Sequence, residues 1–181
     1  GTIWMDRNLG ATQVATSSTD AAAYGDLYQW GRAADGHQIR TSTTAGGPVA
    51  SGSEGQNFII TNYDWLSTKD DTLWQAGNND PCPTGYRVPT ETELNNERLA
   101  FAPNNGSGAY GSALKFTLAG NRSNSAGTLG SVGAGGYYWT STVISDAVND
   151  NNVRYMAIWS SGSGMNTTFR GRGYSVRCIK E

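Results

Sequence analysis

The sequence has 181 residues, the usual size of a single domain that buries its own hydrophobic core. Only 15% of the residues are charged, against about 25% in an average soluble domain, and glycine alone contributes 24 residues. The net charge of −2, with 3 Lys, 10 Arg and no basic run, argues against nucleic-acid binding. No stretch approaches the roughly 20 apolar residues that cross a bilayer, so we expect no membrane insertion by this domain.

The first predicted element is a short amphipathic helix over residues 20–31. In DAAAYGDLYQWG, one helical face carries Ala23, Tyr24, Leu27 and Trp30.

Residues 33–81 follow with little periodicity. They interleave Phe58-Ile59-Ile60 and the aromatic residues Tyr63, Trp65 and Trp74 with Thr, Ser, Gly, Asp and Asn. This pattern predicts a long ordered loop that its aromatic side chains anchor to the domain.

The clearest helix signal lies in VPTETELNNERLAF, residues 88–101. Thr90 occupies the N-cap position and Glu93 follows three residues later, which is a capping box. We expect Leu94 and Leu99 to point inward.

Beyond Pro103, four segments have the pattern of short strands: 114–118, 136–140, 153–160 and 174–179. Turns rich in Gly, Asn and Ser separate them. The C-terminal half is therefore predicted to form an antiparallel sheet.

The two cysteines, Cys82 and Cys178, have no second cysteine or histidine at metal-ligand spacing, which argues against a zinc site. They are either two free buried thiols or one bridge across most of the domain. Low charge with many Asn, Ser, Thr, Gly and Trp residues is typical of an extracellular surface and favours the bridge.

Few side chains point to catalysis. The single histidine, His37, has no serine on a GxSxG turn to activate, and we expect it in a solvated loop. Residues 146–152, DAVNDNN, carry oxygen ligands but lack the spacing and terminal Glu of a calcium loop, so a polar turn is expected.

Five segments match a known family when they are read in order: IWMDRNLGA (3–11), YGDLYQWGR (24–32), DPCPTGYRVPTETEL (80–94), GYYWTST (136–142) and RGRGYSVRCIK (170–180). Together they span nearly the whole chain. They resemble the FISUMP family, the Fibrobacter-type major paralogous domain, which has a C-type-lectin-like fold and is common on exported and surface-attached bacterial proteins.

The resemblance implies a single α+β domain over residues 1–181, with a C-type-lectin-like fold of two short helices, a small twisted antiparallel sheet, long ordered loops and adjacent termini. It places Cys82 and Cys178 in the two cysteine motifs of the family, which implies a disulfide between them. Arg87 and Arg177 are interpreted either as buried forks that tie strands to loop carbonyls or as solvent-facing side chains. The family also implies that some sequence precedes this chain.

Some proteins of this fold are the variable proteins of diversity-generating retroelements, in which template adenines, mostly in Asn codons, are randomised near the 3′ end of the gene. The corresponding binding region here is about residues 137–178. Randomised AAY codons become NNY, which never encodes Lys, Glu, Gln, Met or Trp. Lys, Glu and Gln are absent from residues 143–168, although a chain with few charges also loses them by chance. NNY codons do not reach Met156, Trp159 or Met165.

Strand alternation predicts that Met156 and Ile158 point inward and that Tyr155, Ala157 and Trp159 are exposed. Exposed Tyr and Trp on a strand are typical of a binding surface. We therefore expect one ligand-binding face, formed by Asp146, Asn149, Arg154, Tyr155, Ala157, Trp159, Met165, Thr167, Thr168, Phe169, Arg172 and Tyr174.

The expected function is recognition of a protein or glycan on another cell or virion surface, by a diversity-generating retroelement variable protein. The alternative is a surface adhesin or lipoprotein module of the same family without diversification. We expect a monomer located outside the cell, on the cell surface or on a phage virion.

Two other classes are weighed against this. Formylglycine-generating oxidases share the fold but use paired active-site cysteines, whereas each motif here carries one, so we expect no enzyme and no cofactor. Calcium-dependent sugar binding requires an acidic triplet like EPN, and Ala102-Pro103-Asn104 lacks the acid, so we expect no metal.

Overall fold

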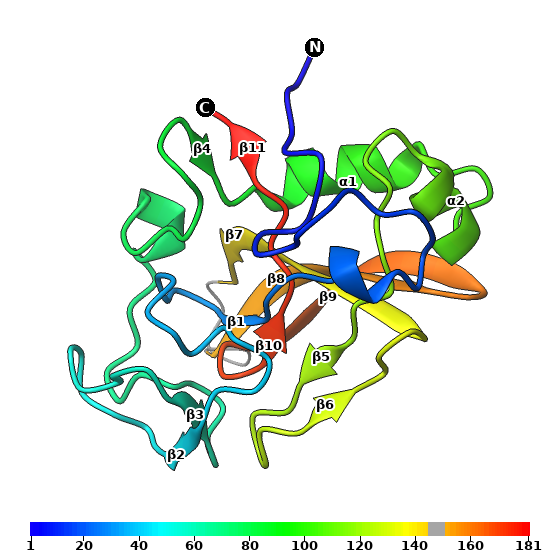
Figure 1. The fold of residues 1–181 in the computed structure, drawn as a ribbon. Coiled ribbons are helices and arrows are strands. Elements are labelled where there is room, and N and C mark those ends of the chain that lie inside the picture. Colours follow the sequence, from blue (N-terminus) through cyan, green and yellow to red (C-terminus); the bar gives the residue numbers. More distant parts are fainter. Residues whose placement is uncertain (145–150) are drawn as a thin grey trace.

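The structure is a computed structural model that describes residues 1–144 and 151–181. The fold is α+β: two helices and several small sheets, mostly antiparallel, joined by long ordered loops (Figure 1). The α-helices are α1 (Glu91–Leu99) and α2 (Gly106–Gly111), and short 3-10 helices cover Ala21–Ala23 (η1) and Trp74–Ala76 (η2). The strands are β1 (Tyr28–Gln29), β2 (Thr44–Gly46), β3 (Phe58–Ile60), β4 (Tyr86–Arg87), β5 (Asn121–Arg122), β6 (Leu129–Gly130), β7 (Gly135–Val143), β8 (Asn152–Trp159), β9 (Gly162–Phe169), β10 (Gly173–Tyr174) and β11 (Ile179–Lys180).

The longest strands, β7, β8 and β9, form one antiparallel sheet in that order. Two residues, Ser160 and Ser161, join β8 to β9, and the pairing then runs without a shift from Trp159 opposite Gly162 to Asn152 opposite Phe169. The helices α1 and α2 pack on one face of this sheet (Figure 1). The core beneath them contains Leu94, Phe101, Ala109, Phe116, Leu118, Tyr138, Met156 and Ile158. The inward orientation of Met156 and Ile158 is therefore confirmed.

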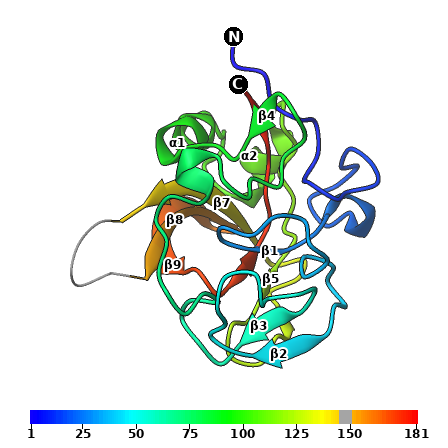
Figure 2. The same cartoon turned by 90° about the vertical axis from the view of Figure 1, so that its left-hand side faces the viewer.

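A second core lies on the other face of the same sheet. Trp139 of β7 and Val153 of β8 enter it, together with side chains from a second sheet of order β1-β10-β5-β6. Figure 2 shows β1 and β5 of this second sheet next to the β7–β8–β9 sheet. Its members include Tyr28, Trp30, Ile59, Trp65, Leu66, Leu73, Trp74, Val88, Tyr174, Val176 and Cys178. Strand β8 is thus covered on both sides along part of its length, because two cores share it.

The capping box of α1 is confirmed. The Thr90 side chain accepts from the backbone N–H of Glu93, whose carboxylate accepts in turn from the N–H of Thr90 at 2.8 Å. Leu94 is fully buried, but Leu99 is 64% exposed, so its expected inward position is wrong. Five residues at about 100° each turn the helix roughly 140° away from the face that Leu94 occupies.

The predicted helix over residues 20–31 is wrong except for η1. Gly25 has φ +68°, and a Cβ there would lie 2.5 Å from the carbonyl oxygen of Leu9. The chain turns at this glycine and pairs with the N-terminal segment, since the N–H of Asp26 donates to Leu9 O at 3.0 Å. The apolar residues that follow enter β1 and the core as extended chain.

The predictions of strands in the C-terminal half are partly confirmed and partly wrong. Residues 136–140 and 153–160 lie in β7 and β8 as expected, but residues 114–118 form no strand. Lys115 has φ +48°, and the next N–H groups donate to separate segments: Phe116 to Ala109 O and Leu118 to Ser18 O. Segment 174–179 divides between β10 and β11, and the polar stretch GSGMNTTF, which has the composition of a loop, is β9.

Residues 33–81 are ordered and anchored, as predicted. Phe58, Trp65 and Trp74 are buried, and β2 pairs with β3 in parallel. Tyr63 is the exception, because its side chain is 60% exposed.

The chain termini are held side by side. Trp4 forms a β-bridge with Ile179, and the N–H of Lys180 donates to Ile3 O at 2.8 Å (Figure 1). Cys82 and Cys178 form a disulfide that closes a sequence separation of 96 residues, which confirms the predicted pairing. No helix among the described residues is long and apolar enough to cross a membrane.

Several arginines are buried and connect segments that are distant in the sequence. Arg177 is fully buried and donates to Leu114 O at 2.5 Å and to Asn8 Oδ1 at 2.7 Å, so of the two interpretations left open the buried fork is the correct one. Arg87 pairs with Glu93 at 2.6 Å. Four buried guanidinium groups lie over aromatic rings: Arg32 over Trp65, Arg122 over Phe58, Arg170 over Trp30 and Arg177 over Phe116. The planar guanidinium can stack and donate at once, which the lysine ammonium cannot.

Candidate ligand-recognition face

The predicted site residues do not share one face. Opposed residues of an antiparallel ladder point to the same side and successive residues to opposite sides. The β8–β9 register therefore divides the described strand members into two groups. Tyr155, Ala157, Trp159 and Thr168 lie on one side, and Arg154, Met165 and Thr167 lie on the helix-covered side. Asp146 and Asn149 lie outside the described residues.

The helix-covered group belongs mainly to the scaffold. Met165 lies opposite Met156 and packs against the core beneath α1. Arg154 forms an ion pair with Glu91 of α1 at 2.7 Å, and Thr167 is exposed. Met165 is therefore corrected from a binding residue to a packing residue.

Tyr174 and Ala157 are also corrected, because they are buried, with 2% and 5% exposure. The Tyr174 ring stacks on Tyr137 at 5.1 Å and lies 4.5 Å from Trp139. Its hydroxyl shares hydrogen bonds with Tyr155 and Thr168, and burial raises its pKa. Tyr174 comes from β10, and strand alternation within β8 could not place it.

The other side of the β7–β9 sheet presents what we call the aromatic face: Tyr137, Tyr155, Trp159, Asn166 and Thr168. Trp159 is 39% exposed, Asn166 is exposed, and the other three are half-buried. Tyr155 lies 6.2 Å from Tyr137 and 4.8 Å from Tyr174 between ring centroids. The face thus has an exposed end at Trp159 and a packed base at Tyr174.

Glycines lie beneath the two outer rings. A Cβ on Gly162 would lie 3.0 Å from the indole Cζ2 of Trp159, and one on Gly164 would lie 3.8 Å from Cη2. A Cβ on Gly135 would lie 2.8 Å from the Tyr137 hydroxyl. The rings therefore lie over backbone that carries no side chains.

The aromatic face is uncharged, and half-buried Arg172 is a nearby cation. Burial raises the pKa of the Tyr155 phenol, and the charge of Arg172 acts in the opposite direction. The Tyr155 phenol is therefore neutral at physiological pH, and its hydroxyl is hydrogen-bonded to that of Tyr174. Rigid Tyr and Trp with adaptable Asn and Thr is a composition typical of binding surfaces.

Sequence reasoning missed Tyr137 and Asn166. Tyr137 stands two residues before Trp139 and so shares its side of β7, a signal that was present in GYYWTST. Asn166 was missed although Met165, Thr167 and Thr168 of the same segment were included, because residues 162–169 were not predicted as a strand. Recognising Ser160-Ser161 as a two-residue hairpin turn would have predicted it.

Phe169 lies away from the aromatic face. It stacks on Tyr63 with ring centroids 4.3 Å apart and an interplanar angle of 31°. Phe169 is therefore corrected from a residue of the binding face to the packing partner of an exposed tyrosine.

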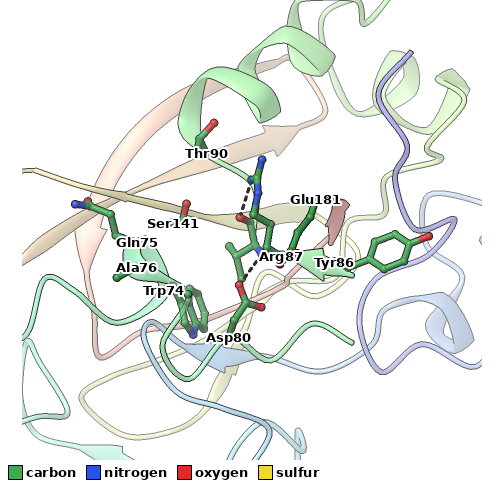
Figure 3. Close-up of a pocket in the computed structure, with 11 residues that line it drawn as sticks. Trp74, Gln75, Ala76, Asp80, Tyr86, Arg87, Thr90, Ser141 and Glu181 are labelled. Carbon is green, nitrogen blue, oxygen red and sulfur yellow. Dashed lines mark hydrogen bonds between the residues drawn. The ribbon is translucent and has the colours of Figure 1, made fainter. Parts of the chain in front are cut away.

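A hollow of about 320 Å³ lies beside β4 and the start of α1 (Figure 3). Its polar groups are occupied by the scaffold. The Asp80 carboxylate accepts from the N–H groups of Cys82 at 2.8 Å and Val88 at 2.9 Å, and burial raises its pKa. Arg87 is held by Glu93 and Thr90 caps α1. These contacts connect the loop that contains Cys82 to the start of α1, so we assign the hollow a structural role.

His37 is buried rather than solvated, which corrects our expectation. Its Nδ1 lies 2.6 Å from Asp35 Oδ1, and its Nε2 accepts from the N–H of Gln29 at 3.0 Å. Burial lowers the pKa of His37 to about 4, although the hydrogen bond to Asp35 acts in the opposite direction. With both nitrogens engaged, His37 stabilises a loop and has no free position for a substrate.

Comparison with known proteins adds no family to these observations: no protein-family model, curated protein or solved structure matches the chain.

Proposed function

We propose that this protein is a ligand-recognition protein that displays the aromatic face on a rigid scaffold. The observation that carries the proposal is Trp159, a large apolar side chain that is 39% exposed and whose ring lies over the backbone of Gly162 and Gly164. Tyr and Trp are the residues that dominate binding energy at protein interfaces. The resemblance to the FISUMP family and its C-type-lectin-like fold agrees with this role.

The scaffold should tolerate substitutions on this surface. The backbone beneath it is fixed by the β7–β8–β9 ladder and by two cores, so the exposed side chains contribute little to folding. Tyr155, Asn166 and Thr168 of the aromatic face are all encoded by NNY codons. Because Met156 and Met165 pack in the core, they count as scaffold, and their codons no longer conflict with adenine-directed diversification.

Trp159 favours the second candidate function, a surface adhesin without diversification, because no NNY codon encodes Trp. For either function we propose that the protein acts outside the cytoplasm, on a cell surface or a virion. A disulfide is consistent with an extracytoplasmic protein.

Two matched libraries test the scaffold role. One randomises Trp159 and Asn166, the exposed members of the aromatic face, and the other randomises Met156 and Ile158. Most clones of the first library should resist proteolysis like the parent, whereas most clones of the second should not. Equal loss in both libraries would contradict a variable surface.

Sequencing the gene from a population grown from one cell separates the two candidates. Diversification predicts substitutions only at positions that correspond to template adenines, confined to codons of the aromatic face and its adjoining loops. An adhesin predicts an unchanged sequence. Adhesion of labelled protein to cells, compared between the parent and the Trp159→Ala and Tyr110→Ala variants, then tests recognition itself, because only the Trp159 variant should lose it.

A further inference from the structure

We infer that the exposed ring of Tyr63 and the hollow beside it form a second binding site, which takes a neutral pyranose sugar. This site contains no residue of the aromatic face and does not depend on the function proposed for that face. Tyr63 is 60% exposed, more than the other aromatic side chains of the described residues.

The Tyr63 ring is exposed but held in place. Phe169, the last residue of β9, stacks on it at 4.3 Å. The backbone below is fixed as well, since the N–H of Gly171 donates to Tyr63 O at 2.8 Å. A Cβ on Gly171 would lie 2.8 Å from Asn62 O, so only glycine permits this close approach. A flat aromatic ring that is fixed before binding loses little entropy when a ligand stacks on it.

Two hollows flank Tyr63. One, of about 300 Å³, is lined by Thr61, Asn62, Tyr63, Asn124 and Ser125. The other, of about 310 Å³, shares Asn62 and Tyr63. Phe169 lines neither hollow, so the contact between Phe169 and Tyr63 fills neither of them. Their size is at the lower end of small-molecule sites, about 300–1,000 Å³, and suits a single sugar ring in each.

The lining of the first hollow matches hydroxyl groups rather than ions, because none of its five side chains is charged. The Asn124 side-chain amide donates to Asn62 O at 2.8 Å, and that of Asn62 donates to Gly47 O. Each bond uses an N–H and so orients the amide oxygen as an acceptor. Amides and hydroxyls that both donate and accept are complementary to sugar hydroxyls.

The backbone at this hollow is held in an unfavourable conformation. Thr61 has φ +75°, which is rare for a β-branched residue, and its N–H donates to Asn124 O at 2.8 Å. Such outliers persist where surrounding contacts fix them and are concentrated at binding sites. The apolar C–H face of a pyranose then fits the electron-rich face of the Tyr63 ring, and its hydroxyls fit the amides.

The second hollow has a largely buried carboxylate in its wall. It is lined by Asp64, which is 8% exposed. Asp64 Oδ1 accepts from the N–H of Leu66 at 3.0 Å, while its buried Oδ2 has no hydrogen-bond partner within residues 1–144 and 151–181.

Titration of the ¹⁵N-labelled protein with methyl glycosides of glucose, galactose, mannose and N-acetylglucosamine tests the site. At least one should bind with a Kd on the order of a few millimolar and shift the amide signals of residues 61–64 and 124–125. The Tyr63→Ala variant should bind about tenfold more weakly, while Tyr63→Phe and the control Tyr110→Ala should bind like the parent. Ser125→Tyr, which fills the hollow from an exposed position, should also weaken binding.

Failure of all four sugars to bind would overturn the inference, as would binding that Tyr63→Ala leaves unchanged. Preference for the anionic methyl glycoside of N-acetylneuraminic acid would contradict the neutral ligand. Trp159→Ala should retain sugar binding. Loss in that variant would assign the sugar to the aromatic face and overturn the second site without touching the function proposed for that face.

Discussion

Substitution of Tyr174 tests which side chains stabilise the fold and which are free to vary. The sequence predicts it as an exposed binding residue, yet it is 2% exposed and contacts Tyr137, Trp139 and Tyr155. Truncating Tyr174→Ala removes about 150–200 Å² of buried surface, which at about 25 cal/mol per Å² corresponds to a loss of roughly 4 kcal/mol in the free energy of unfolding. This agrees with the ~3–5 kcal/mol measured for buried aromatic truncations.

Two matched variants separate packing from hydrogen bonding and from surface effects. Tyr174→Phe keeps the ring but loses the hydroxyl that bonds to Tyr155 and Thr168, and should cost about 1 kcal/mol. Asn166→Ala, an exposed member of the aromatic face, should change stability by about 0.5 kcal/mol or less.

Urea unfolding followed by circular dichroism measures all three variants. With a total stability of roughly 5–15 kcal/mol, the loss in Tyr174→Ala should move the midpoint clearly while the slope stays constant. If Tyr174→Ala costs less than about 1 kcal/mol, or Asn166→Ala costs as much as Tyr174→Ala, then Tyr174 does not belong to the core and the aromatic face is not separate from it.

Three further predictions concern the scaffold. The double variant Cys82→Ala, Cys178→Ala should lose about 4–5 kcal/mol, because the disulfide closes a 96-residue separation; a urea unfolding loss below about 1 kcal/mol would refute the entropic argument. Burial lowers the pKa of His37 in the folded state to about 4, below the unfolded value of 6.5, so its contribution is complete above pH 6.5 and is lost as the pH falls towards 4. Because His37 is the single histidine, His37→Gln should flatten the stability profile between these values, and an unchanged profile would count against this assignment. Unfolding midpoints with millimolar calcium and with a chelator should coincide, because no cluster of acidic, His or Cys ligands occurs in residues 1–144 and 151–181; a rise with calcium would direct attention to residues 146–152.

Local signals succeeded where neighbouring residues decide the conformation. The capping box at Thr90 involves atoms three residues apart, so the sequence alone predicts α1. Alternation along β8 likewise placed Met156 and Ile158 correctly, since one strand has a fixed period of two. The low charge with two cysteines also pointed to the disulfide before any geometry was known.

Other features depend on partners distant in sequence. The chain turns at Gly25 because the backbone of Leu9 lies against it. Leu9 is 16 residues earlier, so the pattern of residues 20–31 contains no information about this contact. Strand β9 has the composition of a loop, but pairing with β8 satisfies its backbone groups. Tyr174 was predicted to be an exposed recognition residue. It is buried because β10 places its ring against Tyr137, Trp139 and Tyr155.

The sequence by itself determined which side chains are available for recognition: Tyr and Trp on a strand, Asn and Thr around them, and few charges to oppose burial. The tertiary structure decided which of them are exposed. Whether a side chain is exposed depends on what packs over its strand. The segments that cover a strand can be distant from it in the sequence. Trp159 stays open because its neighbours across the sheet, Gly135 and Gly162, have no side chains, whereas Tyr63 is exposed beside a hollow whose walls come from residues about 60 positions further along the chain.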